Sequence, residues 1–291
     1  MRHRVEYLFI RLFVFLIRLL PLRVGVGFGG CLGSLYYQID ARHRRLALDH
    51  LSIAFGHTKE PAAIEQIARE SYQNLGRSII EAIYLPQLNL SETERLVRVE
   101  GLSHYIEAKN RKKGVMVLTE HPGNWEIIPK GFWMYGFHVY DIVRPFNNPY
   151  LDRMIDGWRT QNGMTSLNKR TDVSRILGLL RAGETVGFFL DQNTARENAV
   201  FVDFFGREAA THKGPAILAH RSGATVLPVF IVREPSGHRM IIAPPLPIVR
   251  DGNHAENIER TTALFTKTIE SYITQYPAQW LWTHRRWGTT R

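Results

Sequence analysis

The sequence predicts an α/β protein in which a mostly parallel central sheet is covered by helices. Short apolar runs bounded by glycine or polar residues alternate along the chain with longer segments of helical periodicity. Three of these runs stop at clusters of polar side chains, as strands do at the edge of an open sheet. Strands that alternate with helices pair in parallel and are buried on both faces. The 291 residues suffice for one such domain with a small appendage.

The composition narrows the class of partner. With 44% hydrophobic and 22% charged residues, the chain has an ordinary globular composition. Its single cysteine, Cys31, excludes an internal disulfide. The formal net charge of +10 predicts an anionic partner, and the charge alone does not choose between nucleic acid, acidic lipid and an acidic carrier protein.

The first 20 residues are strongly apolar but carry an arginine at every seventh position, namely Arg4, Arg11 and Arg18. This spacing places the three guanidinium groups on one helical face. Two interpretations follow: an interfacial helix with its arginines at anionic headgroups, or a single anchor whose arginines snorkel or face protein. A buried core helix is the plain alternative. The Gly-rich apolar run 24–37 predicts a second helix or a re-entrant hairpin against the same membrane face.

A helical portion follows, and we expect it to pack on the sheet because no long linker separates the two. A basic cluster at 42–45 precedes a helical pattern that ends at Gly56. Pro61 then opens a longer helix, at a position where its missing N–H does no harm, and the apolar face of this helix extends to Ile83.

These patterns divide the chain into two parts. We expect an N-terminal membrane-associated helical segment over residues 1–40 and an α/β domain over residues 41–291.

The apolar run 114–118 is the clearest predicted strand, and it ends in a polar turn that contains His121. A new helical periodicity begins at Trp125, so the local order is strand, tight turn and helix. In an open α/β sheet such a turn lies at the carboxyl end of a strand, where ligand crevices form. Glu126 stands one helical turn beyond His121, and we expect its carboxylate to fold back towards the imidazole ring.

The remaining elements continue the alternation of strands and helices. The predicted strands cover 97–101, 139–143, 186–190, 200–204, 224–232 and 240–243. The predicted helices cover 125–135, 150–161, 172–181, 257–276 and a segment that ends at residue 222.

Polar side chains follow three of the predicted strands: His121 with Glu126, then Arg144, then Asp191 with Gln192. Because parallel strands bring their carboxyl ends to one edge of a sheet, we expect these groups to converge. The plain alternatives are a surface ion pair for Arg144 and a turn residue that bonds its own backbone for Asp191.

A histidine next to a carboxylate is the base and its orienting group in a nucleophilic catalyst. A neutral imidazole titrates near physiological pH and can take a proton from a hydroxyl. No serine or cysteine shares the turn of His121, so we expect a hydroxyl of the substrate to be the nucleophile. Backbone N–H groups at Gly123 and Asn124, or Arg144, are the candidates for stabilising the oxyanion.

The motif His-Pro-Gly-Asn-Trp-Glu at 121–126 resembles the His-x4-Asp/Glu signature of the glycerolipid acyltransferase superfamily. Its Asn-Trp-Glu ending is most similar to the lipid A branch, the lauroyl and myristoyl acyltransferases. Four further blocks resemble this branch in order: Arg-Pro-x-x-Asn-Pro at 144–149, Asp-Gln at 191–192, residues 204–216, and the closing stretch 276–287. One departure is Ala278, where the family often carries glutamate.

The resemblance implies an acyltransferase of lipid A and lipopolysaccharide biosynthesis, with the superfamily's α/β sandwich fold. The reaction would move a fatty acyl chain from acyl carrier protein or coenzyme A to a hydroxyl of a glycolipid, a lipid A precursor above all. We expect no metal and no bound cofactor, since the sequence has no Cys/His cluster of useful spacing. The implied place is the bacterial inner membrane, with an anionic membrane surface as partner and the catalytic domain facing the cytoplasm.

The site residues expected from the turn and from these blocks fall into two groups. The catalytic pair is His121 and Glu126. The expected oxyanion or substrate-binding residues are Gly123, Asn124, Trp125, Arg144, Asp191, Gln192 and Thr211.

Three other interpretations stay open. Within the same class, the acceptor could be a phosphatidylinositol mannoside, or another glycolipid or lysophospholipid, because such enzymes share His-x4-Asp/Glu and the closing His-Arg-Arg-aromatic stretch. A basic nucleic-acid-binding protein would use the basic, tryptophan-rich stretch 280–287 for stacking, but no recognisable nucleic-acid-binding motif is present. A non-catalytic membrane protein is disfavoured by the intact pair of His121 and Glu126.

Overall fold

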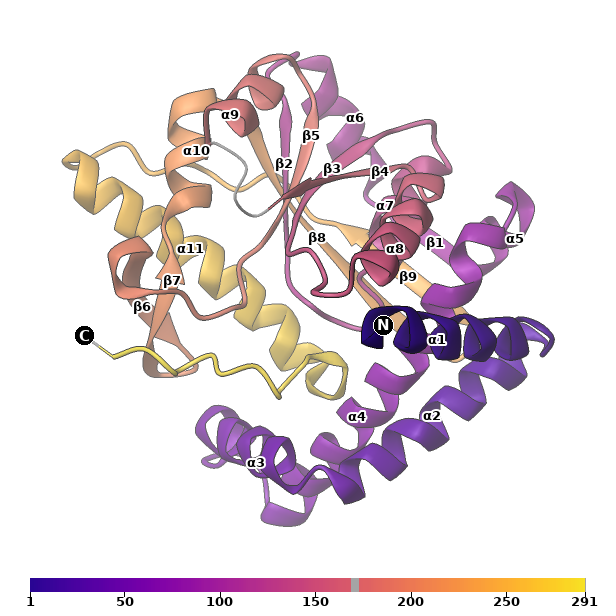
Figure 1. The fold of residues 1–291 in the computed structure, drawn as a ribbon. Coiled ribbons are helices and arrows are strands. Elements are labelled where there is room, and N and C mark those ends of the chain that lie inside the picture. Colours follow the sequence, from indigo (N-terminus) through magenta and orange to yellow (C-terminus); the bar gives the residue numbers. More distant parts are fainter. Residues whose placement is uncertain (169–172, 291) are drawn as a thin grey trace.

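The computed structural model describes residues 1–168 and 173–290. Its centre is a seven-stranded sheet in the order β1-β9-β8-β2-β5-β3-β4 (Figure 1). Its strands are β1 (Val97–Glu100), β2 (Val115–Thr119), β3 (Val139–Val143), β4 (Met164–Asn168), β5 (Thr185–Phe189), β8 (Thr225–Glu234) and β9 (Gly237–Ile242). Neighbouring strands run parallel except for β8 and β9, which form an antiparallel pair. The predicted mostly parallel sheet is therefore confirmed.

Strand β2 lies at the centre because both of its faces are apolar, and all five of its residues are buried. Met116 and Leu118 belong to one hydrophobic core, and Val115 and Val117 belong to the other. The first core is closed by α9 (Val173–Arg181), α10 (Gly214–Ser222) and α11 (His254–Gln275), and the second by α6 (Leu102–Asn110) and α7 (Ile127–Trp133). Helix α8 (Pro149–Gln161) has no buried residue and lies on the outside (Figure 1).

A separate two-stranded ribbon consists of β6 (Ala199–Phe204) and β7 (Arg207–His212). Phe205 and Gly206 connect them with φ values of +57° and +73°, the left-handed pair that a tight hairpin turn requires. The sequence predicted β6 but neither its partner β7 nor strand β4. Both missed strands are rich in polar residues, so they lack the apolar run that identifies the buried strands.

The predicted helices agree with the structure within a few residues at most ends. Helix α7 begins at Ile127, whereas we expected it at Trp125, because residues 123–126 form the turn itself. The expected start of α9 at Asp172 lies outside the described residues. The described residues also form three short 3₁₀ helices: η1 (Leu85–Gln87), η2 (Arg196–Asn198) and η3 (Pro277–Gln279).

Five helices precede or flank the first strand: α1 (Arg2–Arg18), α2 (Leu22–Ile39), α3 (Ala41–Phe55), α4 (Pro61–Tyr84) and α5 (Leu90–Leu96). The run 24–37 is thus one continuous helix and not a hairpin. Helix α2 crosses α4 at very short range. A Cβ atom on Gly29 would lie 2.6 Å from the carbonyl oxygen of Gly76, and one on Gly33 would lie 2.1 Å from the oxygen of Tyr72. Only glycine permits this approach, so α2 is a packing element of the fold.

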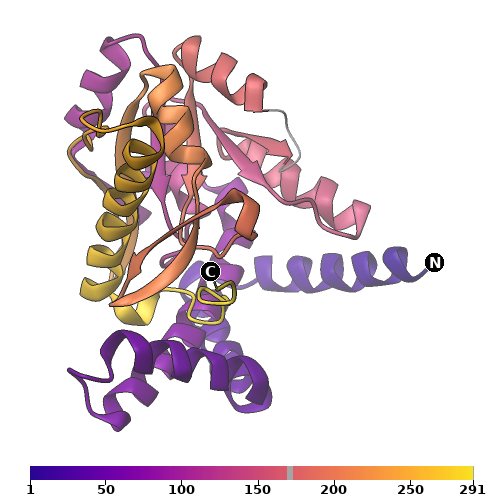
Figure 2. The ribbon, with the colours of Figure 1, turned by 90° about the vertical axis from the view of Figure 1, so that its left-hand side faces the viewer.

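Helix α1 extends away from the α/β body with its N-terminus at the tip (Figure 2). Arg4 donates to the hydroxyl of Tyr150 on α8 at 2.9 Å, and Arg18 donates to the carbonyl oxygen of Ile83 on α4. Two of the three arginines thus bond other helices of the protein. Within residues 2–19, the apolar side chains that are more than half exposed are Leu8, Phe9, Leu12, Phe15, Leu16 and Leu19. Within the described part of the chain, no helix is both long and apolar enough to cross a bilayer.

Candidate active site

The register of two neighbouring strands brings His121 and Asp191 together. Strands β2 and β5 run parallel, with Thr119 opposite Phe189. His121 and Asp191 each follow this pair by two residues, so both stand at the carboxyl edge of the sheet. The Nδ1 atom of His121 lies 2.9 Å from Oδ1 of Asp191, and the backbone N–H of His121 donates to Oδ2 at 3.0 Å.

Asp191 is a fully buried carboxylate that is held by several donors. The indole Nε1 of Trp280 donates to its Oδ2 at 2.9 Å. Burial alone would raise the pKa of Asp191, but the adjacent His121 imidazole, together with His284 and the Trp280 indole, outweighs burial and holds the pKa below its usual range. The ionised carboxylate therefore fixes Nδ1 of His121 as a donor, which leaves the lone pair of Nε2 to act as the base.

The imidazole of His121 is enclosed by rings and opens on one side. Its centroid lies 4.4 Å from that of Phe189, 5.1 Å from that of Trp125 and 5.3 Å from that of His284. The amide nitrogen of the exposed Gln192 lies 3.4 Å from Nε2 of His121. The expected neighbours Trp125, Asp191 and Gln192 are thus gathered around His121, and Gln192 marks the side from which a substrate can approach Nε2.

The prediction that Glu126 contacts His121 is wrong, because the structure pairs Glu126 with another residue. Glu126 instead forms two hydrogen bonds with Arg159 on α8, from Nη2 to Oε1 at 2.6 Å and from Nε to Oε2 at 3.1 Å. Two features explain the difference. Glu126 is the N-cap residue of α7, and its side chain points towards α8. Nδ1 of His121 is already bonded to Asp191. A bidentate guanidinium is also a stronger partner for a carboxylate than a neutral imidazole.

The pair of Glu126 and Arg159 has a second carboxyl group beside it. Asp141 on β3 is buried, and burial together with the nearby negative charge of Glu126 raises its pKa to about 7, although Arg159 opposes this shift. Two carboxyl groups thus share one guanidinium. Arg159 was not predicted as a partner of Glu126. It lies 33 residues further along the chain, on a helix without buried residues, so no local sequence pattern indicates the contact.

One expected oxyanion donor, the N–H of Gly123, and one expected substrate-binding side chain, that of Asn124, are already engaged. The N–H of Gly123 donates to the carbonyl oxygen of Gln279 at 2.7 Å, so it cannot also bind an oxyanion. The side chain of Asn124 is buried and donates to Glu81 at 2.9 Å, so it does not face a substrate. Among the described residues, the N–H groups of Asn124, Trp125 and Glu126 form no hydrogen bond, and they remain the backbone donors at this turn.

Arg144 and Thr211 do not join the group around His121. Arg144 follows β3, is exposed and forms no ion pair with any residue that the structure describes. Thr211 is fully buried, where its hydroxyl accepts a hydrogen bond from Arg286 and donates to the carbonyl oxygen of Ala209. The hydroxyl of Thr211 is therefore occupied by internal partners and is not free for a substrate.

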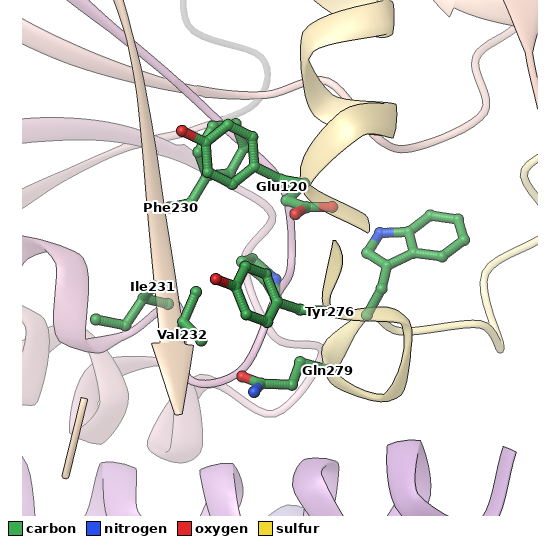
Figure 3. Close-up of a pocket in the computed structure, with 9 residues that line it drawn as sticks. Glu120, Phe230, Ile231, Val232, Tyr276 and Gln279 are labelled. Carbon is green, nitrogen blue, oxygen red and sulfur yellow. The ribbon is translucent and has the colours of Figure 1, made fainter. Parts of the chain in front are cut away.

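A small cavity lies behind the turn, next to the side chain of Glu120 (Figure 3). It measures about 10 Å³, which is room for one water at most. Burial, and then the neighbouring Asp191, raise the pKa of Glu120 well above its usual range, so the carboxyl group is neutral. The cavity itself is too small to admit a substrate.

The arrangement can perform general-base catalysis. It combines an imidazole of defined tautomer, an ionised carboxylate behind it and ring-lined walls that exclude water. In residues 1–290 as the structure describes them, no group of three or more His, Cys, Asp or Glu side chains is arranged to hold a metal ion. The lone Cys31 is exposed on α2, in a different part of the fold.

Comparison with known proteins places this site in context. A family described as bacterial lipid A biosynthesis acyltransferase matches residues 1–289. The chain is 30% identical to a lipid A biosynthesis palmitoleoyltransferase of Escherichia coli over 284 residues, which cover 93% of this chain and 87% of the relative. It is 28% identical to a lipid A biosynthesis lauroyltransferase of the same organism, covering 89% and 84% of the two chains. A phosphatidylinositol mannoside acyltransferase of Mycolicibacterium smegmatis is 25% identical, covering 79% and 75%.

Proposed function

Because the chain belongs to the bacterial lipid A biosynthesis acyltransferase family, and is thus an enzyme that transfers acyl groups, we propose that it moves a fatty acyl chain from an acyl thioester to a hydroxyl of a lipid A precursor. The observation that carries the mechanism is the pairing of His121 Nδ1 with the buried Asp191, which leaves Nε2 on the open side of the site.

The reaction follows from this geometry. Nε2 of His121 takes the proton of the acceptor hydroxyl as its oxygen attacks the thioester carbonyl carbon. Asp191 stabilises the imidazolium that forms. The tetrahedral intermediate then collapses, the C–S bond breaks, and the leaving thiolate takes the proton from the imidazolium. The products are an ester and a free thiol, and the enzyme returns to its starting state without a metal or a bound cofactor.

The oxyanion needs donors that are not already bonded. The backbone N–H groups of Asn124 and Trp125 meet this condition at the turn, whereas that of Gly123 does not. We propose that Glu126, which pairs with Arg159 beside the same turn, contacts the polar part of a substrate and does not orient His121. Arg144, which is exposed after β3, is a candidate cation for an anionic donor or acceptor.

The donor and the acceptor belong to this proposal. Acyl carrier protein and coenzyme A are both anionic, as is a phosphorylated glycolipid, and the net charge of +10 favours all three over a neutral partner. A phosphatidylinositol mannoside is the second candidate acceptor, because an acyltransferase of that glycolipid is 25% identical to this chain.

The exposed apolar face of α1 supports a second part of the proposal, that the protein lies on the bacterial inner membrane with its catalytic domain towards the cytoplasm. Phe9 is 70% and Leu19 is 66% exposed, and such a contiguous patch is unusual for a surface that only meets water. Because Arg4 and Arg18 hold α1 against α8 and α4, the apolar face points outward as an interfacial helix requires. The proposed membrane contact is made by α1, and the division into a segment over residues 1–40 and a domain over residues 41–291 stays a prediction.

Cosedimentation with anionic phosphatidylglycerol vesicles tests the membrane proposal. The double variant Phe9→Ser/Leu12→Ser should bind roughly tenfold more weakly or worse, since each buried apolar side chain contributes about 1.5–3 kcal/mol. Ile106→Ser on α6 is the matched control, since Ile106 is also an exposed apolar helix residue. Equal binding of the double variant and the wild type would contradict the proposal.

Replacement of the base tests the chemistry. His121→Ala should lower the rate of transfer by about 10²–10⁴, the usual contribution of a positioned base, while circular dichroism shows a folded protein. His138→Ala, at an exposed histidine before β3, should keep its rate. A folded and fully active His121→Ala enzyme would refute the base, and a trapped acyl-enzyme before product would refute direct attack by the acceptor.

A further inference from the structure

A buried ion pair lies beneath the turn that carries His121. Glu81 on α4 accepts from Arg233 on β8 at both carboxylate oxygens, from Nη1 at 3.1 Å and from Nη2 at 2.9 Å. The Nε2 atom of His238 lies 2.9 Å from Oε2 of the same carboxylate. Burial would raise the pKa of Glu81, but His238 and Arg233 outweigh it and lower the pKa to about 2. Glu81 is therefore a charged group in the interior, outside the chemistry described above.

This ion pair bonds one residue of the turn directly and a second one through Ser78. The amide of Asn124 donates to Oε2 of Glu81 at 2.9 Å. The hydroxyl of Ser78, one turn earlier on α4, donates to the carbonyl oxygen of Gly123 at 2.6 Å and accepts from Arg233 at 3.2 Å. Helix α4 thus bonds the carbonyl group of residue 123 and the side chain of residue 124.

Gln279 links the same turn to the backbone of Arg233. Its carbonyl oxygen accepts from the N–H of Gly123, and its side chain bonds both the N–H and the carbonyl oxygen of Arg233, at 2.7 Å and 3.0 Å. Gly123 itself has φ +45°, and a Cβ atom there would lie 3.0 Å from the carbonyl oxygen of Ile231. The turn is therefore fixed in a conformation that a side chain at 123 would disturb.

We propose that Glu81 is a positioning residue, which fixes the catalytic turn directly through Asn124, and at Gly123 through Arg233 and Ser78, so that Nε2 of His121 faces the acceptor hydroxyl. The inference rests on the proposed role of His121. Glu81 does not contact His121, so its effect has to pass through the turn. A carboxylate suits this position because it accepts from Asn124 and from two N–H groups of Arg233 at once, which a neutral amide cannot do.

Asn124→Ala is the sharpest test, because it breaks the link to the turn and leaves the pair of Glu81 and Arg233 intact. We expect kcat to fall roughly 10–100-fold, as a small misplacement of a catalytic group does. KM for the acyl donor and for the acceptor should each stay within about twofold, because the variant keeps the backbone N–H of residue 124 and removes only a side chain that is buried against Glu81. Asn110→Ala, at an exposed asparagine on α6, is the control and should keep its kcat.

A spectroscopic measurement separates positioning from a general loss of stability. The Nδ1 proton of His121, bonded to Asp191, should give a low-field proton resonance that His121→Ala removes. In Asn124→Ala this resonance should shift or broaden, because the turn that carries the imidazole has moved. In Asn110→Ala it should stay unchanged.

The charge itself is tested with Glu81→Gln, against Glu65→Gln as the control on the same helix, where Glu65 pairs with Arg69 at the surface. Where Glu81→Gln does not fold because Arg233 keeps a buried charge without its partner, Glu81→Leu/Arg233→Met removes both charges together. The double variant should fold and show a kcat as low as that of Asn124→Ala. An inactive His121→Ala enzyme together with fully active Asn124→Ala and double variants would overturn the role of Glu81 alone. An active His121→Ala enzyme would overturn the proposed base and this inference with it.

Discussion

Asp191 and Glu126 are both carboxylates beside the turn that carries His121, yet only Asp191 contacts the imidazole. Asp191 has no solvent exposure and lies 2.9 Å from Nδ1. Glu126 keeps 21% of its side chain exposed and is engaged by Arg159. Glu126, which is the nearer of the two in the sequence, is thus the one that does not contact His121. Register between strands decides the pairing, and spacing along the chain does not.

The two carboxylates also differ in what their charge can do. In the proposed mechanism the charge of Asp191 faces the ring that becomes positive, so it would stabilise the transition state. The carboxylate of Glu126 is already paired with the guanidinium of Arg159, so it would stabilise an imidazolium at His121 only weakly. A change at Asp191 should therefore affect the chemical step, whereas a change at Glu126 should affect the groups around the turn.

Asp191→Asn should have the largest effect. The amide has the shape of the carboxylate but cannot hold Nδ1–H and stabilise an imidazolium, so we expect the rate to fall by about 10²–10⁴. Steady-state kinetics on the folded variant measure this loss. Asp251→Asn, at an exposed aspartate paired with Arg260, is the control. A rate within about twofold of the wild type would remove Asp191 from the mechanism.

Glu126→Gln should lose less, by roughly tenfold, because one or two charge-assisted hydrogen bonds to Arg159 weaken while His121 keeps its partner. A double-mutant cycle sharpens the contrast. His121→Ala should mask the effect of Asp191→Asn, whereas the effects of His121→Ala and Glu126→Gln should be closer to additive. A loss in Glu126→Gln that equals the loss in Asp191→Asn would show that Glu126 turns to His121 during turnover.

Asp141, the second carboxyl group beside Arg159, gives the smallest effect, and it concerns stability. Its folded pKa of about 7 lies above its unfolded value of about 3.8, so the folded state binds the proton more tightly. The stabilisation is complete below the unfolded pKa and is lost as the pH rises through 7. Between pH 5.5 and 8.5 this amounts to about 2 kcal/mol.

Denaturant unfolding of the wild type and of Asp141→Asn at these two pH values measures that contribution. The asparagine variant does not titrate, so its stability relative to the wild type should increase with pH. Glu120 changes the stability of both proteins in the same direction, and the comparison cancels it. A difference between the two proteins that is constant with pH would show that Asp141 is ionised throughout.

The sequence predicts much of the fold but only part of the site. Strand β3 agrees at both ends with the predicted 139–143, because four of its five residues are β-branched or aromatic and favour a strand. Strand β4 was missed since Met164 and Leu167 are its only two large apolar residues and it lies at the sheet edge. The order of the strands, which places β5 next to β2, depends on packing across the whole sheet and leaves no local trace.

That limit explains the error at Glu126. The convergence of His121 with Asp191 follows from parallel strands and was expected, but the choice between two carboxylates requires the register. Arg159 and Glu81 were missed for a related reason. Each acts on the turn through a contact with residues at least 33 positions away, so neither belongs to a recognisable motif.

The close crossing of α2 and α4 decides where the chain can be shortened. A truncation that removes α1 and keeps α2 begins at Pro21, and it exposes Ile80, Ile83 and Tyr84 of α4, which form a buried cluster with Val14 and Ile17 of α1. A cut after residue 37 would remove nearly all of α2 as well and leave the face of α4 around Gly76 open to water. Helix α4 also carries Ser78 and Glu81, so such a cut would loosen the floor of the catalytic turn.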